Sequence, residues 1–327
     1  MSEPRGGRTT QSQSSAQSAK AKPTYVVSFL SGASGTKPPN KGLAKSFHDA
    51  MKTYEKIGKY KVDPNYFYAD FDDDPGKLFD LAKTALQSPK PAVAIGGSSS
   101  TIKALAQANK SLYPAEADRV PIVMALGGFR DLVNEDPGRI CGMVDHAPGE
   151  ENTQVELLVD YLVGQGTIAD ATGLTGLAFL FNENNAGKQQ QVKDLKRAVA
   201  KVNSSAALID LYQHKLLGKT HREAQELLDK DYQTGKAGGA LAVIVIGDPL
   251  VMSFVEDIVT VSKGTHGLPT MYGSPDDVTV HKGHIAYGCD HGGMFKRAAY
   301  FVHRLLMGAS PSTLGVEYGA PSTLEVL

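Results

Sequence analysis

Residues 92–101, AVAIGGSSST, combine the features that decide the fold: a short apolar run, two glycines and a series of hydroxyl side chains. The apolar run predicts a buried strand, the glycines permit a tight turn, and the hydroxyls are typical of the start of a helix. On both sides of this stretch, short apolar runs alternate with amphipathic segments. Such alternation is typical of a parallel β-sheet covered by helices.

The alternation restarts about halfway along the chain, after residues 145–149. In the first half, strands are expected at 25–30, 65–71, 92–95 and 121–126, with helices at 42–60, 75–87 and 99–110. In the second half, strands are expected at 177–181, 206–212, 240–246, 269–272 and 283–287, with helices at 151–165, 187–202, 221–234, 250–263 and 294–307. Two similar α/β halves, each resembling a Rossmann fold, imply a cleft between them.

Composition excludes several classes of partner. The 327 residues carry 34 Lys and Arg against 35 Asp and Glu, a net charge of −1, which gives no electrostatic basis for binding nucleic acid or an anionic membrane. No apolar run approaches the roughly 20 residues of a membrane-spanning helix. Cys141 and Cys289 are two separate thiols or one bridge, and both options stay open. Residues 1–22, rich in Gln and Ser, predict a disordered tail.

Ligands of open parallel sheets bind beyond the carboxyl ends of the strands, where helices begin. The loop at 95–101 therefore places Ser98, Ser99 and Ser100 at a candidate site, where backbone N–H groups and hydroxyls can hold a carboxylate. The alternative is that one serine only caps the helix. We predict no cofactor for this cleft.

Three further loops lie at the same edge. They contribute Asn184 from residues 181–185, Asp248 from 246–249, and Tyr287 with Asp290 from 286–292. Tyr287 and Asp290 together can bind a ring by stacking and an ammonium group by charge. For the asparagine and both aspartates, the alternative is a turn or a helix N-cap.

Catalytic motifs are not matched. A nucleophile elbow would need Gly where Ser100 stands, and a phosphate-binding loop would need Gly at Gln213. An enzyme would have to use Asp248 or Asp290 as base and His291 as acid. The weak candidates for a metal site have a spacing that matches no standard zinc pattern: His281, His284, Cys289 and His291.

The last third of the chain resembles the substrate-binding components of ABC transporters in the tryptophan/tyrosine-uptake group. The stretches that carry the resemblance are Gly247-Asp248-Pro249, Gly267-Leu268-Pro269, Gly283 to Asp290, Phe295 to Val302 and Leu306 to Leu314. In the first half, Pro137 to Gly142 resembles the crossover of that family. Gly127 to Asp131 replace the family's Ser-Asp-Pro, so the resemblance does not specify the ligand.

The resemblance implies a type 1 periplasmic binding protein fold, with three crossings between lobes that close over an amino acid or related small carboxylate. It implies a first lobe of residues 23–146 plus about 276–310, a second of 147–275 plus about 311–327, and ligand roles for the seven residues named above. It also implies an ABC permease partner and a periplasmic or extracellular location. Because no signal peptide precedes Pro23, a cytoplasmic sensor of the same fold is the alternative.

Overall fold

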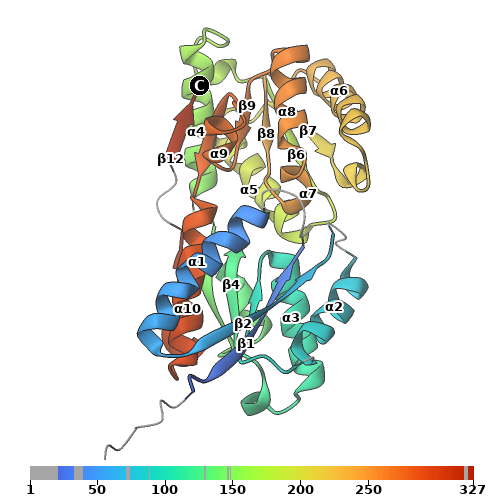
Figure 1. Cartoon of the computed structure of the whole chain (residues 1–327). Coiled ribbons are helices and arrows are strands. Elements are labelled where there is room, and N and C mark those ends of the chain that lie inside the picture. Colours follow the sequence, from blue (N-terminus) through green and yellow to red (C-terminus); the bar gives the residue numbers. More distant parts are fainter. Residues whose placement is uncertain are drawn as a thin grey trace, which may run out of the picture.

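The chain folds into two α/β lobes, one above the other (Figure 1). The structure, a computed structural model, describes residues 21–32, 40–70, 74–87, 89–128, 130–145, 147, 149–319 and 323–327. Each lobe contains one sheet with helices on both faces, which confirms the predicted fold class. The predicted tail 1–22 lies outside the described residues, apart from residues 21 and 22.

The first sheet is parallel throughout. Within the described ranges, six strands pair in the order β11-β5-β4-β3-β1-β2. The elements of this lobe are β1 (Thr24–Ser31), α1 (Asn40–Gly58), β2 (Lys61–Tyr68), α2 (Pro75–Gln87), β3 (Val93–Gly96), α3 (Ser99–Leu112), β4 (Ile122–Gly127), β5 (Ile140–Val144), α10 (His291–Leu306), α11 (Pro311–Leu314) and β11 (Val316–Tyr318).

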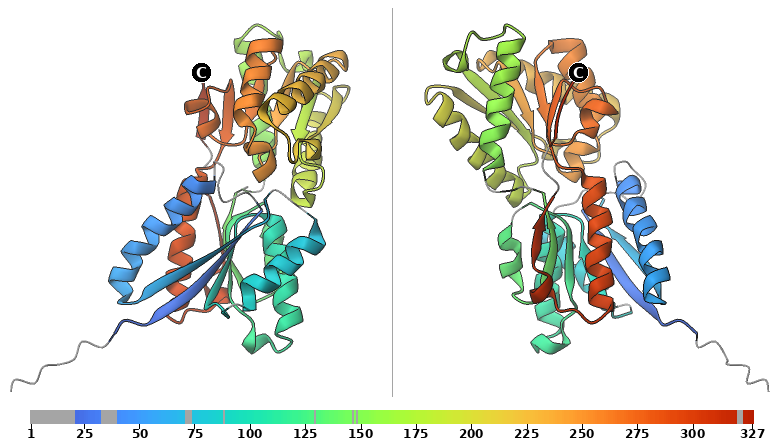
Figure 2. Two further views of the ribbon diagram at one scale, coloured as in Figure 1. Left: turned by 45° about the vertical axis from the view of Figure 1, so that its right-hand side comes forward. Right: turned by 90° about the vertical axis from the view of Figure 1, so that its left-hand side faces the viewer.

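Strand β1 shows why this sheet is covered on both faces. Phe29 packs in one apolar cluster with residues of α1 and α10, whereas Leu30 packs with residues of α2 and α3 on the opposite face. Neighbouring side chains of a strand point to opposite faces, so an unbroken apolar run requires a partner layer on each side. Helices α1 and α10 lie side by side on one face (Figure 2).

The second sheet is mixed. For the part of the chain that the structure describes, its order is β12-β10-β9-β8-β6-β7, and only β12 runs antiparallel to its neighbour. The elements of this lobe are α4 (Glu150–Gly164), β6 (Gly176–Phe181), α5 (Ala186–Val202), β7 (Ala207–Tyr212), α6 (His221–Ala237), β8 (Ala242–Val245), α7 (Pro249–Met252), α8 (Val255–Val259), β9 (Thr270–Tyr272), α9 (Asp276–Thr279), β10 (Ile285–Gly288) and β12 (Thr323–Val326).

Strand β6 is buried in the same two-sided way. Phe179 belongs to the apolar cluster formed with α4 and α5, and Leu180 to the cluster formed with α6, α7 and α8. The predicted single helix at 250–263 is wrong, because Phe254 leaves the helical conformation (φ −117°, ψ 18°) and buries its ring in the second of these clusters. Beyond α8, residues Thr260–His266 form a π-helical turn.

The chain changes lobe after β5, after β10 and after β11. The first change lies at the predicted boundary near residue 146, but the other two do not lie where the sequence placed them. Strand β10, expected in the first lobe, pairs with β9 in the second sheet, and β11, expected in the second lobe, pairs with β5 in the first. The last crossing therefore lies between β11 and β12, which the sequence places in one lobe. A Cβ atom on Gly288 would come within 1.8 Å of the Gly273 carbonyl oxygen, so β10 can approach β9 this closely only with glycine there.

In the described part of the chain, none of the helices combines the length and the apolar character that crossing a membrane requires.

A candidate ligand site between the lobes

The strand ends and helix starts of both lobes meet at a narrow central pocket of about 50 Å³. Helices α3 and α10 begin here from the first lobe, and α5 and α7 begin here from the second. The polar residues that line this central pocket come from both lobes: Ser98, Ser99, Asp145, Asn185, Lys188, Asp248 and His291. The carboxyl ends of both sheets thus converge on one site, as expected for open parallel sheets.

The first-lobe wall is built around the start of α3. The hydroxyl of Ser98 accepts a hydrogen bond from Thr101 N, and the Thr101 hydroxyl accepts one from Ser98 N at 3.0 Å. Ser99 Oγ accepts the N–H of Gly128 at 2.9 Å and so ties α3 to the end of β4. Ser98 is therefore the helix cap that the sequence offered as an alternative. The first turn of α3 has no acidic residue, which leaves it favourable to an anion.

The second-lobe wall is built around Asp248. Its Oδ1 accepts the Val251 N–H at 2.9 Å, and its Oδ2 accepts Asn185 Nδ2 at 3.4 Å. Asp248 is 3% exposed, and burial raises the pKa of its carboxyl against the opposing effects of the Val251 N–H, Asn182 and Lys188. Asn185 Oδ1 in turn accepts the N–H groups of Gly187 and Lys188 at the start of α5. Asp248 is thus a helix cap and a pocket residue at once.

One ion pair spans the central pocket. Lys188 Nζ, from α5 of the second lobe, lies 3.6 Å from Asp145 Oδ2, at the end of β5 in the first lobe. The two side chains are 12% and 6% exposed. Lys188 Nζ also donates to Gln191 Oε1 at 3.3 Å. A pair this well buried is screened little by salt, so it links the lobes more firmly than a surface pair would.

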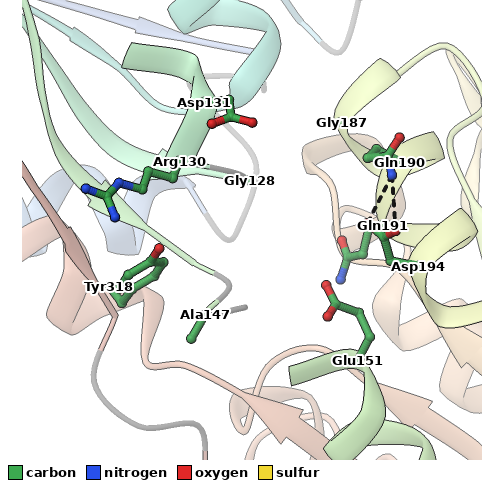
Figure 3. Close-up of a pocket in the computed structure, with 10 residues that line it drawn as sticks. All are labelled: Gly128, Arg130, Asp131, Ala147, Glu151, Gly187, Gln190, Gln191, Asp194 and Tyr318. Atoms are coloured by element: carbon green, nitrogen blue, oxygen red, sulfur yellow. Dashed lines mark hydrogen bonds between the residues drawn. The ribbon is translucent and has the colours of Figure 1, made fainter. Parts of the chain in front are cut away.

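Three larger pockets surround the central one and share residues with it. A pocket of about 360 Å³ shares Gly128 and is lined by Arg130 and Asp131 on one side and by residues of α4 and α5 on the other (Figure 3). A pocket of about 240 Å³ shares Ser99, and one of about 730 Å³ shares Leu43, Met252 and His291. The shared residues show that the three larger pockets adjoin the central one, which is the smallest of the four.

The polar groups of the 360 Å³ pocket come from both lobes. In Figure 3, Arg130 and Tyr318 lie on one side of the opening, and Gln191 and Glu151 lie on the other. Gln190 Nε2 donates to both carboxylate oxygens of Asp194, at 3.1 and 3.0 Å. This pocket is polar, whereas the 730 Å³ pocket has an apolar wall that includes Leu43, Met252, Phe254 and Val255.

The seven sequence-predicted ligand residues fall into two groups. Ser98, Ser99 and Asp248 line the central pocket, while Ser100 and Asn184 line the adjoining 240 Å³ pocket. The structure therefore brings these five together at the interlobe cleft.

Tyr287 and Asp290 line none of these four pockets. Tyr287 packs against the core of the second lobe. Asp290 is exposed and caps α10 by accepting the Gly293 N–H at 2.9 Å. The capping alternative accounts for this contact, and a ligand role for Tyr287 and Asp290 stays a prediction.

The weak metal candidates are dispersed. His281 lies 3.5 Å from Glu256, and burial lowers the pKa of His284 to about 4. The Cys289 thiol donates to the carbonyl oxygen of Asp145 at 3.4 Å, and His291 lines the central pocket. Within the described ranges, no three His, Cys, Asp or Glu side chains are placed to hold a metal ion. Cys141 and Cys289 are separate buried thiols.

Sequence reasoning missed Asp145, Lys188 and Asn185. Asn185 lies in the loop at 181–185, next to Asn184. Its position just before the helix expected at 187–202 indicates a helix N-cap, so it could have been predicted. Asp145 lies where the alternation of apolar and amphipathic segments restarts. Lys188 gave no local signal, because a lysine in the first turn of a helix is usually a solvated residue.

Comparison with known proteins supports the fold. No protein-family model matches the sequence, and no curated protein matches it. Among solved structures, a conserved domain protein from Vibrio cholerae has a TM-score of 0.71 at 17% identity, over 92% of this chain and 91% of that one. An ABC domain from Streptococcus pneumoniae in complex with L-Trp has a TM-score of 0.69 at 17% identity, with the same coverage.

A third structure, an ABC transporter solute-binding protein from R. palustris in complex with 4-hydroxybenzoate, has a TM-score of 0.56 at 16% identity, over 86% of this chain and 79% of that one. These likenesses, together with the two-lobed topology, establish the type 1 periplasmic binding protein fold. The expected fold is thereby confirmed.

Proposed function

We propose that this protein binds a small solute, an amino acid or related small carboxylate, between its two lobes and presents it to an ABC permease outside the cytoplasm. The observation that carries the proposal is the convergence of buried polar side chains from both lobes on one central pocket. Neighbours of the same fold include ABC transporter proteins in complex with L-Trp and with 4-hydroxybenzoate, which are both small carboxylates.

Binding at the central pocket requires the lobes to move. The central pocket of about 50 Å³ is far smaller than the roughly 300 Å³ or more of typical ligand sites. A solute of amino-acid size therefore has to enter while the lobes are further apart, and their return encloses it. Three crossings between rigid sheets provide the hinge for such a closure.

No observation favours the enzyme alternative. Both oxygens of Asp248 accept hydrogen bonds from its own lobe, and Asp290 caps a helix outside the four pockets. A general base needs an oxygen within reach of a substrate proton.

A thermal-shift screen of amino acids, aromatic acids and aliphatic carboxylates tests the proposal. A solute that binds only the folded protein raises the free energy of unfolding by about 2.7 kcal/mol at a concentration of 100 Kd. Mass spectrometry of the recovered solute then shows whether it is unchanged, as binding requires, or altered, as an enzyme would leave it. A screen without any stabilising carboxylate would count against the proposal.

A further inference from the structure

Lys188 stands where two buried carboxylates from opposite lobes approach each other. Its ammonium is 3.6 Å from Asp145 Oδ2, and its charge opposes the effect of burial on the pKa of Asp248. All three residues line the central pocket. The protein thus supplies its own cation at the place where carboxylates of both lobes face the solute.

Both carboxylates already have charged or hydrogen-bonding groups of the protein beside them. Asp145 pairs with Lys188, and Asp248 accepts from Val251 N and Asn185 Nδ2 through its two oxygens. An ammonium group of a ligand that approached Asp145 would lie beside the Lys188 ammonium or would have to displace it. The first arrangement brings two like charges together, and the second leaves a buried lysine without its counter-charge, which is strongly unfavourable.

The same arrangement favours a carboxylate. A lysine ammonium carries three N–H donors, of which Lys188 gives one to Gln191 Oε1, while Asp145 Oδ2 lies at 3.6 Å as its ion-pair partner. The start of α3, with Ser98 and Ser99 on the pocket wall, adds a partial positive charge. The central pocket therefore offers a charge-assisted donor to a carboxylate, while its own lysine cation repels an ammonium group.

We propose that Lys188 determines specificity in the cleft by occupying the position of a ligand ammonium, so that the protein prefers carboxylates without an α-ammonium group over the corresponding amino acids. The inference rests on the proposed solute-binding function and narrows its ligand class. Specificity of this kind comes from a repulsive element, here a like charge, as much as from an attractive one.

Matched ligand pairs test it by calorimetric titration of the full chain at pH 7. Each pair differs only in the ammonium group: alanine and propionate, leucine and 4-methylpentanoate, phenylalanine and 3-phenylpropionate. For the pair whose side chain fits, we expect the wild type to bind the member without the ammonium at least tenfold more tightly. Lys188→Met should shift this ratio at least tenfold toward the amino acid, because Asp145 is then available to pair with its ammonium.

Two further variants make the test specific. Lys193→Met removes the same charge from an exposed position of the same helix and should keep the wild-type ratio. Lys188→Met combined with Asp145→Asn removes both charges, avoids an unpaired buried acid, and should lose the preference without gaining affinity for amino acids. The double variant keeps the test valid if Lys188→Met alone does not fold.

The outcomes separate the two proposals. Tighter binding of the amino-acid members by the wild type, or an unchanged ratio in both Lys188 variants, would overturn the role of Lys188 and leave solute binding intact. If no member of any pair binds the wild type, while the folded protein shows its normal unfolding transition, binding of small carboxylates itself is wrong and the inference falls with it.

Discussion

The loop after β8 and the loop after β10 have the same local structure in different surroundings. Asp248 and Asp290 each accept the backbone N–H of the residue three positions further on, at 2.9 Å in both cases. Asp248 is buried and lines the central pocket, whereas Asp290 is exposed and lines none of the four pockets. Local sequence thus specifies a cap, and the packing of the lobes decides whether the cap belongs to a ligand site.

The glycines of these two loops should respond most differently to substitution. A Cβ atom on Gly288 would lie 1.8 Å from the Gly273 carbonyl oxygen, whereas one on Gly247 would contact the Met252 side chain, with its sulfur at 3.4 Å. We expect Gly288→Ala to lower the free energy of unfolding by about 3 kcal/mol and Gly247→Ala by less than about 1 kcal/mol. Urea denaturation measures both, and equal losses would contradict the close approach of β10 to β9.

Removal of the two caps should separate the buried aspartate from the exposed one. Asp248→Ala deprives Val251 N and Asn185 Nδ2 of their acceptor in a buried place, so we expect a loss of about 2 kcal/mol. Asp290→Ala removes only an exposed cap, at a cost of about 1 kcal/mol. The same denaturation series compares them. A larger loss of unfolding free energy for Asp290→Ala than for Asp248→Ala would contradict the burial of Asp248 and the exposure of Asp290.

These loops also show what the sequence predicts and what it does not. The alternation of apolar and amphipathic segments predicted both sheets, and α2 forms over the predicted residues 75–87. The apolar runs could not show which sheet a late strand joins, because β10 and β11 are short and their pairing with β9 and β5 depends on the path of the crossings. Likewise, Ser98 and Asp248 follow strands and were predictable, whereas the contact of Lys188 with Asp145 forms only when the lobes meet.

A second buried acid, Asp277, contrasts with Asp248, whose two carboxylate oxygens both accept hydrogen bonds. Burial, with the nearby charge of Asp276, raises the pKa of Asp277 from 3.8 to about 8, and among the described residues its Oδ2 has no hydrogen-bond partner. The folded state keeps this proton up to about pH 8, while the unfolded chain releases it near pH 4. The contribution of Asp277 to stability therefore falls as pH rises between these values.

Asp277→Asn should remove that pH dependence. We expect the free energy of unfolding of the variant to exceed that of the wild type by at least about 1 kcal/mol at pH 8, because each pKa unit of the shift corresponds to about 1.4 kcal/mol. The difference should shrink toward pH 4. Thermal unfolding from pH 4 to pH 8 measures it, and a difference independent of pH would refute a protonated Asp277.

The smallest expected effect is that of Asp290→Asn on ligand affinity. A direct contact of Asp290 with a ligand ammonium would make Asp290→Asn weaken binding by about 2 to 5 kcal/mol. Because Asp290 caps α10 outside the four pockets, and asparagine caps equally well, we expect a change within about 0.5 kcal/mol. Calorimetric titration with the carboxylate found in the thermal screen decides between these values.

Hydrogen exchange of the full chain, with and without that carboxylate, tests most directly whether both lobes hold the solute. We expect slower exchange at saturation in the first turn of α3, in the first turn of α5 and in residues 247–252, since all three border the central pocket. Residues 288–293 should change less than residues 247–252. Protection confined to one lobe, with binding retained, would contradict a ligand site shared between the lobes.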